Sequence, residues 1–273
     1  KKVVIADNCA TYANMIFNNQ QEYSGSTLLL GAFFFAFQIY GDFSGYSDIA
    51  IGISRLFGFN LKRNFAFPYF SRDIAEFWRR WHISLSTWFR DYLYIPLGGS
   101  RGGTKMKVRN TFIIFIVSGF WHGANWTFVV WGALNAIYFL PLLLLKKNRV
   151  NTNLVAEGKY FPTIKELFQM LLTFFITLIA WVFFRADNVT NAFVFIKDMF
   201  SSSLLSKPDI VPITVLGLLG LFITIEWLGR AGEYAIEKID FLNKPLRWSF
   251  YMLLIILMFV YTGEQQEFIY FQF

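Results

Sequence analysis

The sequence is poor in the residues that form disulfides and hold metals. It contains one cysteine, Cys9, and two histidines, His82 and His122. A lone cysteine excludes an intramolecular disulfide, and so few cysteines and histidines leave no metal cluster to build from them. The sequence also has no Walker phosphate loop and no dinucleotide-binding fingerprint. We predict no metal site, and histidine chemistry must therefore lie at His82 or His122.

Charged residues are scarce too, at 16% of the 273 residues, where soluble domains carry about 25%. Hydrophobic residues make up 55% and aromatic residues 21%, and the stretch from Thr111 to Leu145 has no Asp, Glu, Lys or Arg. Long uncharged blocks rich in aromatic residues are typical of membrane-spanning helices and their interfacial ends. A soluble enzyme with a large core is the alternative, and the uncharged blocks argue against it. We predict an all-α polytopic membrane protein.

The charge that is present is unevenly placed. Residues 60–110 carry ten basic and three acidic residues, which accounts for the whole net charge of +7. A basic segment can bind nucleic acid, but between apolar blocks it is more typical of a loop on the cytoplasmic side. We predict that residues 60–110 are largely cytoplasmic.

Five apolar stretches are candidates for membrane-spanning helices, and they cover residues 26–59, 111–145, 163–184, 210–225 and 248–263. The stretch 111–145 is too long for one straight span and contains "GFWHG". It predicts two short helices or one broken helix, with both ends on the basic side. The stretch 163–184 opens with Thr163 and Glu166 at the spacing of a capping box.

The first apolar stretch contains two acids, Asp42 and Asp48, beside two glycines, Gly41 and Gly45, where the helix could bend. The carboxylates either line a cavity or pair with Arg55 or another basic residue, and we favour pairing. Acids at membrane depth usually face a partner or a polar cavity.

Residues 71–90 predict one amphipathic helix that lies in the membrane interface. Asp73 and Glu76 stand at capping-box spacing, and Glu76 can pair with Arg79 or Arg80. Apolar residues follow at steps of three and four, namely Ile74, Phe77, Trp81, Leu85 and Trp88. The glycine-rich "IPLGGSRGG" at 95–103 predicts a loop.

The two histidines each allow a structural and a functional interpretation. His122 lies in an uncharged block beside Gly123, so it is either a general base with room for a substrate or a hydrogen-bond partner of a neighbouring helix. His82 is either an interfacial residue or a second polar group of the same cavity, with Trp78 and Ser86 on its helix face at i−4 and i+4.

Two neighbours of His122, Trp121 and Asn125, are expected to line or support the same site. The residues alone leave two kinds of protein open: an enzyme that moves an activated group, and a transporter or export-complex component in which the buried histidine relays protons.

Four long motifs carry a resemblance to a known family. They are "QIYGDFSGYSDIAIG", "NFAFPYFSRDIAEFWRRWHISLSTWFRDYLYIPLGGSR", "SGFWHGANWTFVVWG" and the final "FIYFQF". Together they resemble the membrane-bound O-acyltransferase family, and its bacterial branch that contains the membrane subunit of alginate O-acetyltransferase. The resemblance implies a ring of tilted transmembrane helices around a tunnel. It implies that His122 is the catalytic histidine and that His82 is a second histidine of the tunnel.

The resemblance also implies an activity. A short acyl group, expected to be acetyl from cytoplasmic acetyl-CoA, would pass to an extracytoplasmic polysaccharide or to a partner acetyltransferase, in a bacterial inner membrane and with no bound cofactor. Three arginines of the basic segment could attract the donor's phosphates or anchor the chain to anionic lipid; these are Arg79, Arg80 and Arg90.

The chain departs from the family pattern at two points. Asn135 and Ala136 stand where relatives often carry a histidine and a glycine, so we assign no catalytic role there. The N-terminal half typical of the family is not present, and we expect residues 1–273 to be a single membrane domain and the C-terminal part of a longer chain.

Overall fold

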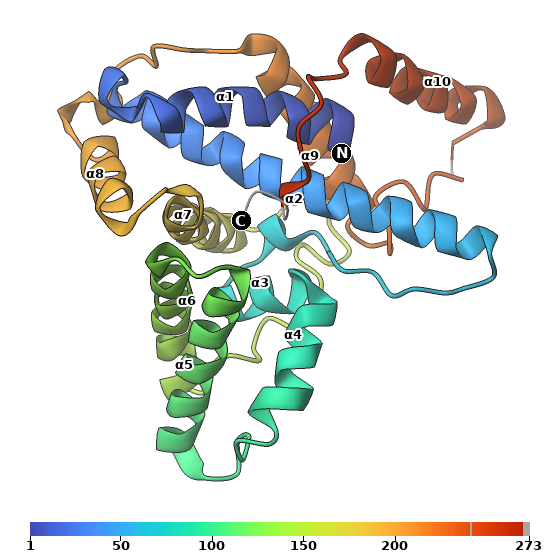
Figure 1. The fold of residues 1–273 in the computed structure, drawn as a ribbon. Coiled ribbons are helices and arrows are strands. Elements are labelled where there is room, and N and C mark those ends of the chain that lie inside the picture. Colours follow the sequence, from blue (N-terminus) through green and yellow to red (C-terminus); the bar gives the residue numbers. More distant parts are fainter. Residues whose placement is uncertain (241, 270–273) are drawn as a thin grey trace. The chain divides into compact units, whose positions relative to one another are not determined.

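Helices joined by turns build the chain in a computed structural model, which describes residues 1–240 and 242–269 (Figure 1). The last four residues of the "FIYFQF" motif lie outside the described residues. The chain divides into two compact units: unit 1 holds residues 1–61 and 198–273, and unit 2 holds residues 62–197. The α-helices are α1 (Asp7–Asn18), α2 (Gly25–Leu56), α3 (Ile74–Arg80), α4 (Ile83–Phe89), α5 (Gly103–His122), α6 (Trp126–Leu144), α7 (Ile164–Arg185), α8 (Val189–Met199), α9 (Ile213–Gly229) and α10 (Lys244–Val260).

Three of the described helices, α2, α6 and α7, are long and apolar enough to cross a bilayer by their length and composition. A span needs about 20 mostly apolar residues. The apolar helices α9 and α10 are shorter, at 17 residues each. The prediction of an all-helical chain with membrane-length apolar helices is confirmed.

In unit 1, α1 packs along α2, and a short π-helical segment, η1 (Lys2–Ala6), leads into α1. The glycines of α2 serve this packing. A Cβ on Gly41 would lie 3.3 Å from the Cβ of Ala6, and one on Gly45 would lie 3.0 Å from the backbone nitrogen of Lys2. The helix continues through both glycines, so their contribution is close approach of η1 to α2.

In unit 2, α5 and α6 form an antiparallel pair (Figure 1). The two backbones approach closely at two glycines: a Cβ on Gly119 would lie 2.2 Å from the carbonyl oxygen of Phe128, and one on Gly132 would lie 2.2 Å from that of Phe115. Small residues allow this kind of contact between membrane helices. The two-helix interpretation of 111–145 is confirmed, with the break between His122 and Trp126.

The break also explains how α6 begins. The Asn125 side chain accepts a hydrogen bond of 3.1 Å from the Thr127 backbone N–H, which caps the helix. The predicted capping box of α7 is present between Thr163 and Glu166. Turns occupy most of the glycine-rich loop 95–103, as predicted.

The prediction of one helix over residues 71–90 is wrong. Two short helices, α3 and α4, replace it, and His82 lies between them with a left-handed backbone at φ +43°. The cause is tertiary: Asn64 accepts a hydrogen bond from Ile83 N–H, and Ala66 N–H donates to the carbonyl of Arg80. Histidine is among the non-glycine residues that adopt this backbone conformation more readily.

The apolar stripe over residues 71–90 also differs from the expected membrane-facing surface. Ile74, Phe77 and Trp81 are buried within the protein, while Trp88 is 52% exposed. The first half of the stripe therefore packs inside unit 2. Because the helix breaks at residue 82, Trp78 and Ser86 do not share one helix face with His82 as predicted.

Gly132→Ala tests the close contact of α5 and α6. The added methyl meets backbone atoms that cannot rotate away, so the variant should lose about 1–3 kcal/mol of stability. Gly217→Ala in α9 is the matched control, because its Cβ would meet nothing within 4 Å. Thermal unfolding in detergent should show a lowered Tm for Gly132→Ala alone. Equal Tm values for both variants would contradict the packing described.

Candidate functional site

His122 is the last residue of α5, at the turn into α6, and its half-buried imidazole is surrounded by aromatic rings. The ring centroids of Trp131 and Phe184 lie 5.2 and 5.0 Å from that of His122, both edge-to-face. Phe128 lies 6.3 Å away. Helices α5, α6 and α7 thus each contribute to the surroundings of this histidine.

His82 reaches the same region from the break between α3 and α4. Its ring stacks on Phe65 at a centroid distance of 6.4 Å. His82 and His122 are close enough to interact electrostatically. The structure therefore brings together the two histidines of the chain, which are 40 residues apart in the sequence.

An aromatic cluster connects the two histidines, and we define it as Trp78, Trp81, Trp131, Trp181 and Phe184. Trp131 lies 5.7 Å from Trp78 and 5.9 Å from Trp181, and Trp81 lies 5.1 Å from Trp181, all between ring centroids. Trp131 and Trp181 are each 2% exposed. Such a wall excludes water and lowers the local dielectric constant, which strengthens any electrostatic interaction made beside it.

The same burial sets the charge state of His82. Burial lowers the pKa of His82 to about 4, because an imidazolium is poorly solvated among aromatic rings. At neutral pH the ring is uncharged, and a neutral imidazole has one unprotonated nitrogen, which is a proton and hydrogen-bond acceptor.

The other residues predicted around His122 take different positions. Trp78 belongs to the aromatic cluster, where it also packs on Phe115 at 5.3 Å. The Trp121 ring lies 5.0 Å from the His122 ring and is 51% exposed. Asn125 caps α6 and donates to the Asp187 carbonyl at 2.9 Å, and the Ser86 hydroxyl donates to the Trp81 carbonyl at 3.3 Å.

Asp42 and Asp48 make ion pairs within unit 1. Lys2 Nζ lies 2.8 Å from Asp42 and Lys1 Nζ lies 3.0 Å from Asp48. The expected pairing with a basic residue is thus present, although Arg55 is not the partner: its guanidinium lies over the Tyr234 ring, 5.4 Å from the centroid. A tunnel-lining role for the two aspartates stays a prediction.

The predicted donor-binding arginines are all engaged in local contacts. Arg79 donates to the carbonyls of Asn148 and Asn151 at 2.9 and 2.7 Å, and Arg90 pairs with Asp91 at 2.7 Å. Arg80 pairs with Glu76 at 2.8 Å, as predicted. Arg79 and Arg90 are exposed and Arg80 is half-buried.

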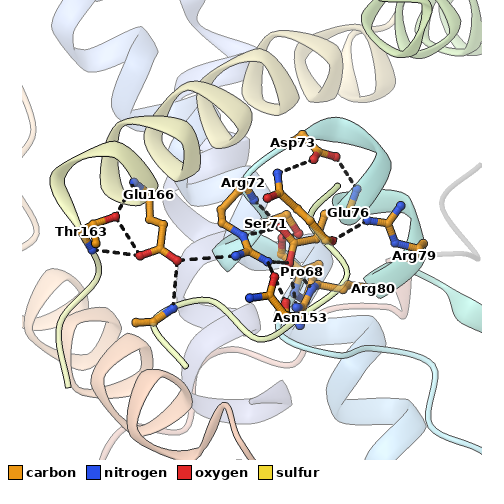
Figure 2. A network of polar contacts seen from close by, with 12 residues as sticks. Pro68, Ser71, Arg72, Asp73, Glu76, Arg79, Arg80, Asn153, Thr163 and Glu166 are labelled. Atoms are coloured by element: carbon orange, nitrogen blue, oxygen red, sulfur yellow. Dashed lines mark hydrogen bonds and ion pairs between the residues drawn. The ribbon is translucent and has the colours of Figure 1, made fainter. Parts of the chain in front are cut away.

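Sequence reasoning missed a buried polar network centred on Glu76 (Figure 2). Glu76 is 1% exposed and accepts hydrogen bonds from Arg80 and from both the backbone and the side chain of Arg72. Arg72, 6% exposed, also donates to the Asn153 carbonyl at 2.7 Å and reaches Glu166 at 3.5 Å. The capping-box spacing of Asp73 and Glu76 was the available signal, and only its first half is present: Asp73 accepts from the Glu76 N–H.

This network joins segments that are distant in the sequence. It ties the entry to α3 to the loop around Asn153 and to the first turn of α7, where Glu166 accepts from Thr163 and Ala156 (Figure 2). Helix α3 ends at Arg80, two residues before His82, and α7 carries Trp181 and Phe184. The network therefore fixes the two elements that bracket the histidines.

Asn135 and Ala136, where the family pattern differs, lie inside unit 2. Asn135 is 2% exposed and its side chain donates to the Trp131 carbonyl at 2.8 Å. The residue thus satisfies a carbonyl of its own helix, at Trp131 of the aromatic cluster.

The described residues form a helical protein with apolar helices of membrane-spanning length. Two neighbouring imidazoles lie in an aromatic wall of this helical membrane protein. Comparison with known sequences identifies its family. The model of the membrane-bound O-acyltransferase family matches residues 5–184, which include both histidines. The chain belongs to this family.

Several bacterial relatives are similar to the chain. It is 38% identical over 252 residues to the probable alginate O-acetylase AlgI of Pseudomonas aeruginosa, covering 90% of this chain and 45% of that protein. It is 43% identical over 199 residues to a peptidoglycan O-acetyltransferase of Helicobacter pylori, covering 73% and 36%. A teichoic acid D-alanyltransferase of Streptococcus thermophilus is 35% identical over 162 residues, 55% of this chain and 39% of the relative. The chain thus spans less than half the length of these relatives.

Glu76→Gln tests the buried network. The substitution removes the negative charge and leaves two guanidinium groups poorly compensated in the interior, so the variant should lose about 3–5 kcal/mol of stability. Asp91→Asn is the control, because its pair with Arg90 is exposed and exposed pairs contribute little. Thermal unfolding should separate the two. A Glu76→Gln variant as stable as Asp91→Asn would contradict the importance of the network.

His82 should make stability depend on pH. In the unfolded chain the histidine binds a proton below about pH 6.5. In the folded protein the pKa of His82 is about 4, so it binds the proton only at lower pH. The neutral ring's contribution is therefore fully present above about pH 6.5 and is lost as the pH falls toward about 4. His82→Asn does not titrate and tolerates the left-handed backbone.

We expect the Tm of the wild type to fall more than that of His82→Asn between about pH 7 and about pH 5. Ser84→Asn, at an exposed neighbouring position, controls for the introduced amide. Parallel Tm curves for the wild type and His82→Asn would refute a buried neutral imidazole.

Proposed function

We propose that this protein is a membrane O-acyltransferase that moves an acetyl or other short acyl group from a cytoplasmic thioester donor to an extracytoplasmic polysaccharide, directly or through a partner acetyltransferase. The observation that carries the proposal is the family match across both histidines, together with their juxtaposition in one aromatic wall. The names of the relatives agree with it, since they describe a probable alginate O-acetylase, a peptidoglycan O-acetyltransferase and a teichoic acid D-alanyltransferase.

The proposed general base is His122. Its neutral imidazole takes the proton of an incoming hydroxyl, which belongs to a sugar or to a serine of the partner. The freed oxygen attacks the thioester carbonyl, and the thiolate of CoA leaves and recovers the proton as a thiol. His82, the second neutral imidazole, orients or hydrogen-bonds one of the reacting groups.

The proposed setting is a bacterial inner membrane, with the helices arranged as a ring around a tunnel and the basic segment 60–110 on the cytoplasmic side. Three features support it: the apolar helices α2, α6 and α7, the basic excess of that segment, and the family. Acetyl-CoA is the proposed donor. Of the arginines proposed to meet its phosphates, Arg79 and Arg90 are exposed to solvent.

His122→Ala should lower acyl transfer by at least about a hundredfold, because a positioned general base contributes roughly 10²–10⁴. The measurement is transfer of radiolabelled acetyl from acetyl-CoA in membranes that carry the full-length protein, with polymer and co-purifying proteins both counted. Lys207→Ala, in an exposed loop of unit 1, is the control at matched expression.

Full activity in His122→Ala would remove the histidine from the mechanism. If the wild type moves solute without an acyl donor and labels no polymer, the protein is instead a transporter in which the histidine relays protons.

A further inference from the structure

Three buried polar atoms of unit 2 have no hydrogen-bond partner among the described residues: the indole nitrogens of Trp78 and Trp181 and the hydroxyl of Thr127. Buried polar groups are nearly always paired, and a buried tryptophan usually finds an acceptor for its N–H. Leaving such a group unpaired costs about 1–3 kcal/mol. Each exception therefore calls for an explanation.

Each of the three residues adjoins a residue that contacts His122. Trp78 and Trp181 both contact Trp131, which contacts His122. Thr127 directly precedes Phe128, whose ring lies 6.3 Å from that of His122. The unpaired polar groups thus lie one residue removed from the proposed base, on the rings and the turn that adjoin its direct neighbours.

Packing alone does not explain the choice of tryptophan. Phe184 occupies the same cluster, 5.3 Å from Trp181 and 5.0 Å from His122, and offers an aromatic surface without an N–H. An indole at position 181, 2% exposed, carries the cost of an unpaired donor that a phenyl ring would avoid. The indole N–H of Trp181 therefore has a role in a state of the protein that brings a hydrogen-bond acceptor to it.

We infer that the indole N–H groups of Trp78 and Trp181 are hydrogen-bond donors to the carbonyl oxygen of the acyl group during transfer. The inference rests on the proposed function and adds to it the groups that stabilise the developing negative charge. A carbonyl oxygen is the acceptor expected beside a base that activates a hydroxyl for attack on a thioester.

Acyl transfer then proceeds by addition to the carbonyl and loss of the thiolate. His122 takes the hydroxyl proton, the hydroxyl oxygen forms a bond to the carbonyl carbon, and the carbonyl π electrons move to its oxygen. The two N–H groups donate to this oxyanion. When the electrons return, the carbon–sulfur bond breaks, and the thiolate takes the proton from His122. Donors aimed at an oxyanion in an apolar site are often the largest single contribution to such catalysis.

The test replaces the indole N–H alone. Benzothienylalanine has sulfur in place of the indole nitrogen and keeps the bicyclic shape, so packing is preserved. At position 181 or 78 of the full-length protein it should lower kcat by about a hundredfold, the smaller end of the loss seen for one oxyanion donor, with KM little changed. The matched control is position 227, a half-buried indole of unit 1 that lies outside the aromatic cluster.

Three outcomes decide the inference. A loss at 181 or 78 but not at 227 supports it. Wild-type kcat at both positions 181 and 78 overturns it, and so does an equal loss at 227, which would show a general effect of the analogue.

A second measurement separates this inference from the proposed function. The full-length protein, with ¹⁵N-labelled indoles in nanodiscs, is titrated with a ketone analogue of acetyl-CoA in which a methylene group replaces the thioester sulfur. The N–H resonances assigned through Trp78→Phe and Trp181→Phe should move downfield. Unmoved resonances overturn the donor role even if acyl transfer is found, and moved resonances support it even if the wild type transfers nothing.

Discussion

The pairing of the buried Glu76 carboxylate with two arginines is the interaction on which the histidine region depends. In an apolar interior a guanidinium must be paired, and Glu76 accepts from both Arg72 and Arg80. Because Arg72 also holds the Asn153 loop, a single carboxylate links the start of α3 to a distant loop. The turn that presents His82 follows directly, so its left-handed backbone is held by contacts on both sides.

Polar groups in unit 2 are divided between two surroundings. Around Glu76 every charge has partners, and hydrogen bonds supply the rigidity. Around His122 the surroundings are aromatic, and the indole nitrogens of Trp78 and Trp181, one ring removed from it, have no hydrogen-bond partner among the described residues. The first arrangement is typical of a structural network and the second of a site that completes its hydrogen bonds with a substrate.

Sequence patterns predicted what depends on local periodicity and composition. The uncharged block with "GFWHG" predicted the α5–α6 pair, and Thr163 with Glu166 predicted the start of α7. Tertiary contacts decided the rest. Periodicity over 71–90 is helical throughout, and only the hydrogen bonds to Asn64 and Ala66 break it at His82. The proximity of His82 to His122 is likewise a property of the folded chain. The residues left it open as one of two interpretations, and the family resemblance favoured it.

An apolar wall around the proposed general base, His122, creates a constraint of its own. The imidazole of such a base must take a proton where burial disfavours the imidazolium. The pKa of His82, lowered to about 4, shows how strong this effect is. A charged intermediate in such surroundings must be brief or stabilised locally. Transfer from a thioester meets the first condition, since the leaving thiolate takes the proton back. Neutral N–H donors meet the second, because they stabilise an oxyanion without placing a further unpaired charge beside the histidines.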